Sequence, residues 1–239
     1  MDKTDPFAPV IPTPTALRPL LGLTVLVIED SRFACEAMRL LCLRSGARIR
    51  RADCLKSARR HLQVYRPSVV IVDVGLPDGN GLDLIAELTQ CDPRVDVVLG
   101  TSGDPDAQAQ CMASGADGFL EKPITSLSVF QQAVIANLPP DRQPAGLREV
   151  SDDQISPDIM AFQDDMAHIA GVLDDQSDDT TLDYVAQFLG GVARSARDDG
   201  LEKAAAAIAA KRAAGKSAAS EAARLSELIQ QRLTRKLAI

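Results

Sequence analysis

The sequence predicts an α/β domain with a doubly wound, five-stranded parallel sheet, followed by an all-α C-terminal region. Between residues 23 and 138, five short apolar runs alternate with five longer amphipathic stretches. The runs are rich in β-branched residues and lack strict polar alternation, as expected for parallel strands buried on both faces. After residue 158 only helical patterns remain. Strict alternation of strands and helices over such a length is typical of a doubly wound sheet.

The five apolar runs are the predicted strands. They cover residues 23–28, 47–52, 69–74, 95–100 and 117–122. Arginines interrupt the second run, so we expect it at the edge of the sheet. In open α/β sheets, ligands bind beyond the carboxyl ends of the strands, and the residues that end each strand are therefore candidates for a site.

The five amphipathic stretches are the predicted helices of this domain. They cover residues 32–45, 54–65, 81–90, 105–114 and 125–138. Gly46 and Gly115 follow the first and fourth of them, where glycine favours a left-handed C-cap. Asp104 and Pro105 are typical of a helix start, with aspartate as N-cap and proline at the first helical position.

Two segments lack any periodicity and divide the chain into four parts. Residues 1–21 contain five prolines, which remove donors and fix φ, so they predict an extended, poorly ordered arm. Residues 139–158 are polar and contain prolines, and they are interpreted as a linker. The α/β domain then covers residues 22–138, and a helical effector or interaction region covers residues 159–239.

The C-terminal region carries apolar seams at helical spacing. Residues 159–173 and 182–196 place apolar side chains three and four positions apart, which favours pairing with another helix. Residues 203–223 contain twelve alanines, interrupted by Gly215. Residues 217–237 carry a further apolar stripe. These patterns predict helical hairpins whose seams are buried against each other, against the α/β domain or across a homodimer.

Composition excludes several kinds of protein. Tryptophan is absent and only six Phe and two Tyr occur, which argues against a base-stacking surface. Five scattered cysteines and two histidines argue against a disulfide framework and a zinc site. No signal-peptide pattern and no run of about 18 apolar residues is present, so neither a secreted nor a membrane protein is indicated. The expected location is the cytoplasm.

Charge is unevenly spread along the C-terminal part. Residues 151–200 carry 2 basic and 12 acidic groups, whereas residues 201–239 carry 8 and 3. The two segments can pair within a chain or between chains. The basic tail also allows contact with DNA, but no helix-turn-helix spacing is clear and alanine dominates it, so DNA binding is the less favoured reading.

Charged side chains end the predicted strands. Glu29 and Asp30 follow the first strand, and Asp73 lies at the end of the third. Thr101 follows the fourth strand, and Lys122 ends the fifth. We expect these side chains to meet at one edge of the sheet. Crowded carboxylates repel one another unless a hard cation neutralises them, and oxygen ligands suit Mg²⁺. A lysine and a hydroxyl beside such a carboxylate form a receptacle for a phosphoryl group.

Four motifs, in this order, resemble those of the receiver domains of bacterial two-component response regulators. They are VLVIED at 25–30, VDVGLPDGNGL at 72–82, VVLGTSGD at 97–104 and GADGFLEKP at 115–123. The resemblance covers about residues 22–138 and implies a flavodoxin-like receiver fold. Glu29 departs from the commoner aspartate but keeps the charge.

The resemblance also implies roles for the site residues. Asp73 is the implied phosphoacceptor, and Asp30 and Asp73 bind Mg²⁺ directly. Glu29 assists through a water molecule, and the backbone carbonyl of Gly75 is a further ligand.

The same resemblance assigns the switch residues. Thr101 and Lys122 contact the acyl phosphate, and Phe119 occupies the aromatic switch position, with a plain core role as the less favoured alternative. The peptide bond between Lys122 and Pro123 is usually cis in this family. We expect the signal to leave through the fourth helix, fifth strand and fifth helix.

Gly75 and Ser102 flank the implied acceptor and are small. They leave the path of an attacking water open, and neither supplies a group to orient it. The acyl phosphate is therefore expected to be moderately short-lived.

Two features of the C-terminal region resemble functional motifs only loosely. Residues 210–217 match AxxxxGKS, but an alanine-rich helix precedes them instead of the strand that a phosphate-binding loop requires. His168 lies within a predicted helix, where phosphotransfer is conceivable. Ile169 and Ala170 follow it in place of the usual small residue and lysine, so an ordinary surface histidine is favoured.

Together these observations predict a response regulator of a two-component phosphorelay. It accepts a phosphoryl group from a sensor histidine kinase or a phosphotransfer protein on Asp73, with Mg²⁺ as cofactor. It is not an enzyme with a separate substrate, but assists its own phosphorylation and dephosphorylation. The helical region is predicted to bind an unknown protein partner or a second copy of the chain, and not a membrane. The alternatives are a DNA-binding transcriptional regulator and a phosphorelay intermediate that uses His168.

Overall fold

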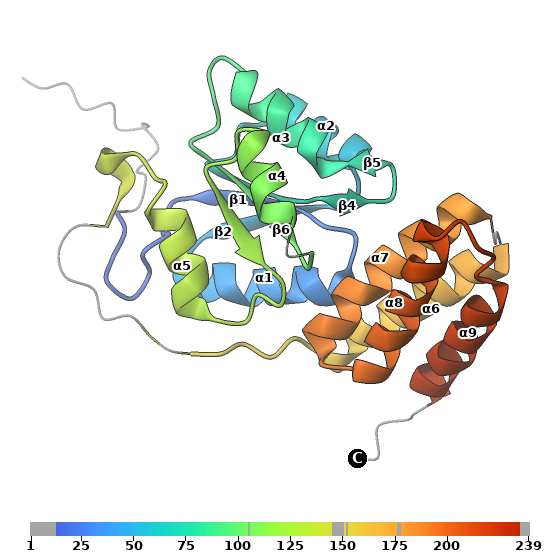
Figure 1. Ribbon diagram of the computed structural model, residues 1–239. Helices are drawn as coiled ribbons and strands as arrows, with labels where there is room; N and C mark the ends of the chain where they lie inside the picture. Colours follow the sequence, from blue (N-terminus) through green and yellow to red (C-terminus); the bar gives the residue numbers. More distant parts are fainter. Residues whose placement is uncertain (1–12, 105, 145–150, 152, 176–177, 235–239) are drawn as a thin grey trace, which may run out of the picture.

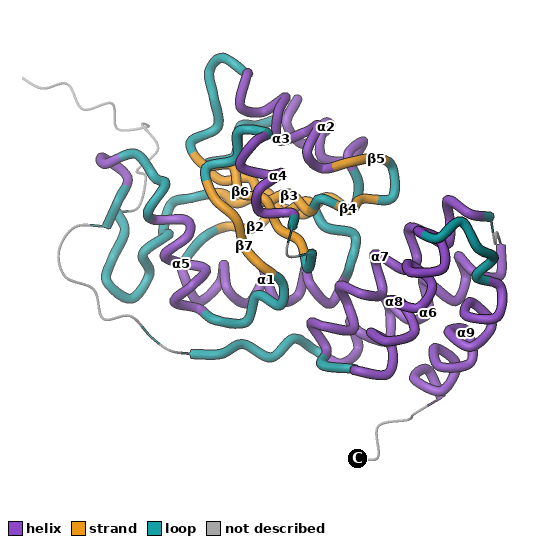
Figure 2. The backbone as a smooth tube through the Cα atoms, viewed as in Figure 1, coloured by secondary structure: helices purple, strands orange, loops and turns teal. Residues whose placement is uncertain are grey.

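A computed structural model describes residues 13–104, 106–144, 151, 153–175 and 178–234 (Figure 1). An α/β part with a central sheet lies beside a group of C-terminal helices (Figure 2). Among the described residues, no helix combines the length and the apolar character that crossing a bilayer requires.

The α/β part contains a five-stranded parallel sheet with the order β2-β1-β3-β6-β7. Its strands are β1 (Thr24–Ile28), β2 (Arg48–Ala52), β3 (Val69–Asp73), β6 (Val97–Ser102) and β7 (Gly118–Glu121). The arginine-rich β2 lies at an edge, as predicted. A short hairpin of β4 (Gly75–Leu76) and β5 (Gly79–Asn80) follows β3. The predicted fold class is confirmed.

Five helices cover the two faces of this sheet. They are α1 (Arg32–Ser45), α2 (Leu55–Val64), α3 (Gly81–Gln90), α4 (Ala107–Ala113) and α5 (Leu127–Ile135). Helices α1 and α5 pack with Val25 and Val27 on one face, and α2, α3 and α4 pack with Leu26 and Ile28 on the other. Because successive residues of β1 point to opposite buried faces, the strand shows no polar alternation.

The helix ends lie close to the predicted ones, but α4 and α5 are shorter than predicted. Gly46 and Gly115 have φ values of 85° and 95° after α1 and α4, the left-handed conformation predicted for them. The predicted start at Asp104 differs from the observed one, since α4 begins at Ala107 after Asp106. The Asp104 carboxylate accepts a hydrogen bond from Asp106 N at 3.0 Å, which forms a turn before the helix. Pro105 lies outside the described residues.

The predicted arm and linker are partly described. Residues 1–12, 145–150 and 152 lie outside the described residues. Leu20 is fully buried, and its amide donates to Ser45 O at 2.9 Å, so the end of the arm is part of the core, unlike the extended prediction. In the linker, Pro140–Arg142 forms a 3₁₀ turn, and Ile155 is buried beside α5. Burial of an apolar side chain explains the ordering at Leu20 and at Ile155.

The C-terminal region is helical, as predicted. It contains α6 (Ile159–Asp175), α7 (Asp179–Ala196), α8 (Asp199–Ala213) and α9 (Ala219–Thr234). Both predicted seams face a single apolar cluster that also includes Leu201, Ile208, Leu225 and Ile229. Gly215, with φ 64°, lies in the turn after α8. Residues 210–217, which match the loose phosphate-loop pattern, form the end of α8 and this turn.

The helical region packs mainly against α1, through α6 and α7, and α7 also contacts β4. The rings of Phe33 and Phe162 meet edge to face, with centroids 5.9 Å apart. This position differs from the face formed by α4, β7 and α5, through which the sequence predicts that the signal leaves.

Leu189 lies at the centre of the helical cluster and is fully buried. Leu189→Asp should lower the free energy of unfolding of the helical region by at least about 3 kcal/mol, because it buries a charge and leaves a cavity. Urea denaturation followed by circular dichroism measures this. Leu43→Asp, on a side chain that is 54% exposed on α1, is the matched control and should change stability by less than about 0.5 kcal/mol. Equal losses in the two variants would contradict the observed packing.

Candidate functional site

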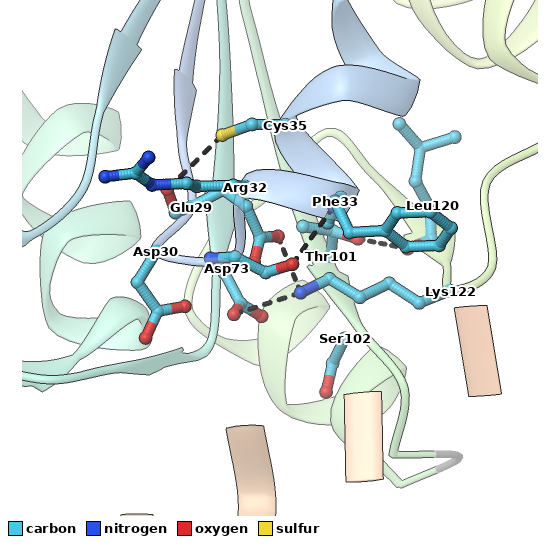
Figure 3. A network of polar contacts seen from close by, with 12 residues as sticks. Glu29, Asp30, Arg32, Phe33, Cys35, Asp73, Thr101, Ser102, Leu120 and Lys122 are labelled. Atoms are coloured by element: carbon cyan, nitrogen blue, oxygen red, sulfur yellow. Dashed lines mark hydrogen bonds and ion pairs between the residues drawn. The ribbon is translucent and has the colours of Figure 1, made fainter. Parts of the chain in front are cut away.

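Four charged side chains meet at the carboxyl ends of the strands (Figure 3). Glu29 and Asp30 follow β1, Asp73 ends β3, and Lys122 follows β7. They meet because the strands are parallel, so that the ends of β1, β3 and β7 face the same edge. The structure therefore brings the predicted acidic residues and the lysine together.

Lys122 joins two of the carboxylates. Its Nζ lies 2.6 Å from Glu29 Oε2 and 3.0 Å from Asp73 Oδ2. Glu29 and Lys122 are buried, and among the described residues Glu29 Oε2 makes no aligned hydrogen bond despite the close ammonium group. One ammonium group thus lies among three carboxyl groups, so their charges are not fully balanced when all three are deprotonated.

The carboxylate cluster fits a divalent cation. Glu29, Asp30 and Asp73 each place an oxygen atom within 4.8 Å of the others. The donors are oxygen atoms only, which suits Mg²⁺ better than a transition metal. The incompletely satisfied Glu29 oxygen and the uncompensated charge are the features that a bound cation would satisfy.

Burial and mutual repulsion shift the titration of these groups. Burial, followed by the charge of Asp73, raises the pKa of Asp30 to about 7. Burial also raises the pKa of Glu29, although Lys122 opposes the shift. Burial lowers the pKa of Lys122, but Asp73 and Glu29 outweigh it and raise this pKa well above its ordinary range. The lysine therefore stays charged at neutral pH.

The predicted switch residues lie near the cluster in different orientations. Thr101 Oγ1 donates to Leu120 O at 2.7 Å, so the hydroxyl points to β7, whereas Ser102 lines the cavity above Asp73. Phe119 is partly buried and packs with the core on the α2–α4 side. The peptide bond between Lys122 and Pro123 is cis.

A carboxylate from α6 fixes the helical region on α1. Asp165 is 1% exposed and accepts hydrogen bonds from Ser31 Oγ at 2.7 Å, Arg32 N at 2.7 Å and Phe33 N at 3.1 Å. These donors form the amino end of α1, where unpaired amides and the helix dipole favour a negative charge. Sequence reasoning missed this residue, because an aspartate pair in an amphipathic helix resembles a solvated face.

A tyrosine from α7 reaches the carboxylate cluster itself. Tyr184 Oη donates to Asp30 Oδ2 at 2.8 Å, and His168 Nε2 lies 3.4 Å from the same Tyr184 oxygen. On the rim, Arg32 and Asp164 form an exposed ion pair at 2.8 Å. No local sequence pattern could have identified Tyr184 as a site residue, because its partner Asp30 lies 154 residues away in the sequence.

A cavity of about 580 Å³ lies between the sheet edge and helices α7 and α8. The α/β part contributes Asp73, Gly75, Ser102 and Lys122 to its walls, among others. The helical part contributes Gln187, Gly191 and Arg194 from α7, and Arg212 from α8. The carboxylate that the sequence singles out therefore faces a space closed partly by the C-terminal region.

A family model described as the response regulator receiver domain matches residues 25–134. Two curated relatives are the KDP operon transcriptional regulatory protein KdpE of Escherichia coli K12 and the virulence transcriptional regulatory protein PhoP of Salmonella typhimurium LT2. KdpE is 29% identical over 99 residues, which cover 41% of this chain and 44% of KdpE. PhoP is 28% identical over 152 residues, which cover 58% of this chain and 68% of PhoP.

Solved structures of receiver domains are also similar. A putative response regulator from Chloroflexus aurantiacus is 25% identical, with a TM-score of 0.44, and the match covers 48% of this chain and 98% of that one. The receiver domain of sensor histidine kinase PA1611 from Pseudomonas aeruginosa, solved with a magnesium ion in its active-site cleft, is 18% identical, with a TM-score of 0.43, and the match covers 48% and 96%.

The crowded carboxylates should destabilise the protein when divalent cations are removed. The pKa of Asp30 is raised from its ordinary value of 3.8 to about 7, so the folded chain binds this proton more tightly than the unfolded chain. The resulting stability is complete below about pH 4 and is lost as pH rises through about 7. In chelator at about pH 8, Asp30→Asn should therefore be more stable than wild type by about 1–3 kcal/mol.

Denaturant unfolding at several pH values, with chelator present, measures this difference. Asp53→Asn is the matched control, since Asp53 is an exposed aspartate close to the site. Its effect should stay within about 0.5 kcal/mol at every pH. A wild type whose stability rises between about pH 5 and 8, or an Asp30→Asn variant weaker than wild type at the upper end, would contradict the electrostatic account.

Proposed function

We propose that this chain, whose residues 25–134 are a response regulator receiver domain of a two-component system, accepts a phosphoryl group on Asp73. The single observation that carries this proposal is the setting of the Asp73 carboxylate. It faces an open cavity, lies 3.0 Å from the ammonium group of Lys122, and adjoins Glu29 and Asp30. The donor is a phosphohistidine of a sensor histidine kinase or of a phosphotransfer protein.

In the proposed transfer, an oxygen of Asp73 attacks the phosphorus in line. The P–O bond to Asp73 forms as the P–N bond to the donor histidine breaks, and the imidazole leaves. Lys122 stabilises the negative oxygens of the transferring group, because it is charged and already in contact with Asp73. The chain thus assists its own phosphorylation and dephosphorylation and turns over no separate substrate.

Mg²⁺ is the proposed cofactor. Asp30 and Asp73 would hold it directly, Glu29 through water, and the backbone carbonyl of Gly75 would complete the protein's share of ligands. When bound, the ion supplies positive charge that offsets repulsion between the carboxylates and the incoming phosphoryl oxygens. Asp30 must be deprotonated to act as a ligand, which its raised pKa makes harder below about pH 7.

The helical region is the proposed output element. The Tyr184 hydroxyl donates a hydrogen bond to Asp30, a proposed metal ligand. Binding of a metal ion or a phosphoryl group would therefore compete with this hydrogen bond, which holds α7 in place. Thr101 is the proposed partner of the phosphoryl group on the other side, and turning its hydroxyl from Leu120 O would allow Phe119 to move. The region then binds a protein partner or a second copy of the chain.

DNA binding is the second candidate output. KdpE and PhoP are named as transcriptional regulatory proteins, and residues 201–239 of this chain carry a net charge of +5. A gel shift on mixed DNA at several salt concentrations tests it, because phosphate contacts make affinity fall steeply with salt. Binding of the phosphorylated chain at physiological salt would favour this output over a protein partner.

A relay through His168 is the third candidate. His168 is exposed and lies 3.4 Å from Tyr184, which itself contacts Asp30. Chase of labelled phosphate from the chain to a second receiver domain tests it, with His168→Gln as the comparison. Equal transfer from both proteins would exclude a role for this histidine.

Asp73→Asn should abolish phosphorylation. The substitution keeps the shape of the side chain and removes its nucleophilic oxygen. Incubation with acetyl phosphate and Mg²⁺, followed by intact mass measurement, should show one added phosphoryl group on wild type and none on the variant. Asp104→Asn, at another carboxylate that lines the same cavity, should be labelled like wild type. Labelling of Asp73→Asn at the wild-type level would refute the assignment.

Phosphorylation should loosen α7 where it meets the site. With Mg²⁺ present throughout, acetyl phosphate should increase hydrogen exchange around Tyr184 in wild type but not in Asp73→Asn. Tyr184→Phe, which lacks the hydroxyl that bonds Asp30, should show faster exchange there without phosphorylation. Changes confined to α4, β7 and α5 would instead place the output on the face first expected from the sequence.

A further inference from the structure

One face of α7 runs along the cavity above Asp73. Tyr184, Gln187, Gly191 and Arg194 line this face, spaced three, four and three residues apart, so they form one stripe on the helix. Tyr184 is bound to Asp30 at one end of the stripe. At the other end, the Arg194 guanidinium lies 2.7 Å from where a Cβ on Gly103 would be. Both ends of the stripe therefore lie against the α/β part, and Tyr184 is hydrogen-bonded to it.

Gln187 fills the space beside Gly75 that the α/β part leaves free. A Cβ built on Gly75 would collide with the Gln187 carboxamide. Gly75 lies two residues after Asp73 and borders the same cavity. The absence of a side chain at this position is therefore what admits the glutamine from α7.

The Gln187 carboxamide is free to bind water. Its side chain is exposed toward the cavity, and it makes no hydrogen bond to any of the described residues. A carboxamide offers two donor hydrogens and an acceptor oxygen, so it can orient a water molecule in a defined direction. Ser102, the other small neighbour, instead accepts a hydrogen bond from Asp104 N at 3.1 Å.

The cavity has room for the reaction at this point. A Cβ on Gly191, one turn after Gln187, would meet nothing within 4 Å. The cavity of about 580 Å³ exceeds the volume of a phosphoryl group and a few water molecules. Gln187, Asp73 and Lys122 thus border one solvent-filled space.

We propose that Gln187 is a catalytic residue for hydrolysis of the aspartyl phosphate and holds the attacking water. The inference rests on the proposed phosphoacceptor role of Asp73. The water oxygen bonds to phosphorus as the P–O bond to Asp73 breaks, which yields the free carboxylate and dihydrogen phosphate. The proton of the water passes to a phosphate oxygen, and the amide oxygen only accepts a hydrogen bond from the water. The helical region thereby sets the lifetime of the signal in the receiver of the same chain.

Shielding is the physical alternative to orientation. A side chain over Gly75 can also block water from the phosphorus, in which case its loss would shorten the lifetime. Two substitutions separate these roles. Gln187→Ala removes both bulk and hydrogen bonding, whereas Gln187→Met keeps the bulk and removes the hydrogen bonds.

The experiment uses the full chain, phosphorylated with acetyl phosphate and Mg²⁺ and then freed from the donor. Decay of the added phosphoryl mass gives the half-life. Both Gln187→Ala and Gln187→Met should lengthen it about five- to tenfold, the effect of losing one aligned hydrogen bond. Gln230→Ala, at an exposed glutamine on α9 outside the cavity, is the matched control and should decay like wild type.

The outcomes separate the inference from the proposed function. If wild type takes up no phosphoryl group on Asp73, the proposed function fails, and the inference fails with it. If wild type is labelled but both variants decay at its rate, only the role of Gln187 is refuted. A shorter half-life for Gln187→Ala, with no change for Gln187→Met, would establish shielding and equally overturn the inference. Circular dichroism of each variant confirms that α7 remains folded.

Discussion

The buried contact between Asp165 and the amino end of α1 holds α6 on the α/β part, and α6 in turn positions the helices that border the cavity at Asp73. It gives the first amides of α1 a charged acceptor and removes a carboxylate from water, so each partner would be left unsatisfied without the other. Such a contact is directional, unlike the apolar packing of Phe33 on Phe162 beside it. The angle at which α6 leaves α1 therefore fixes where α7 passes over the sheet edge.

The carboxylate cluster, in contrast, destabilises the fold when no cation is bound, because its three carboxylates repel one another. Lys122 balances part of the charge, and Tyr184 donates the hydrogen bond that Asp30 accepts from the helical region. A cation or a phosphoryl group would alter the same carboxylates. The free energy of ligand binding is thus linked to that of helix docking through one shared residue, and by reciprocity docking must weaken or strengthen ligand binding.

The sequence was sufficient for the elements and for the carboxylate cluster, but not for the position of the helical region. Strand ends such as Asp73 and Lys122 could be placed together because a parallel sheet brings them to one edge. The seams of α6 and α7 could be identified because burial imposes their spacing. Asp165, Tyr184 and Gln187 could not be found, because their partners are far away in sequence and their residue types are ordinary on an exposed helix. The orientation of Thr101 toward Leu120 likewise depends on a side-chain rotation that no pattern encodes.

Two glycines of the α/β part, Gly75 and Gly103, make room for side chains of α7. From the sequence, Gly75 indicates only an open path to Asp73, the proposed phosphoacceptor. In the structure it is a recess that receives the Gln187 carboxamide, and Gly103 similarly faces Arg194. A side chain at either glycine would displace the far end of Gln187 or of Arg194 from its present position. The space beside Asp73 is therefore shaped jointly by the glycines of the α/β part and by the side chains that α7 places against them.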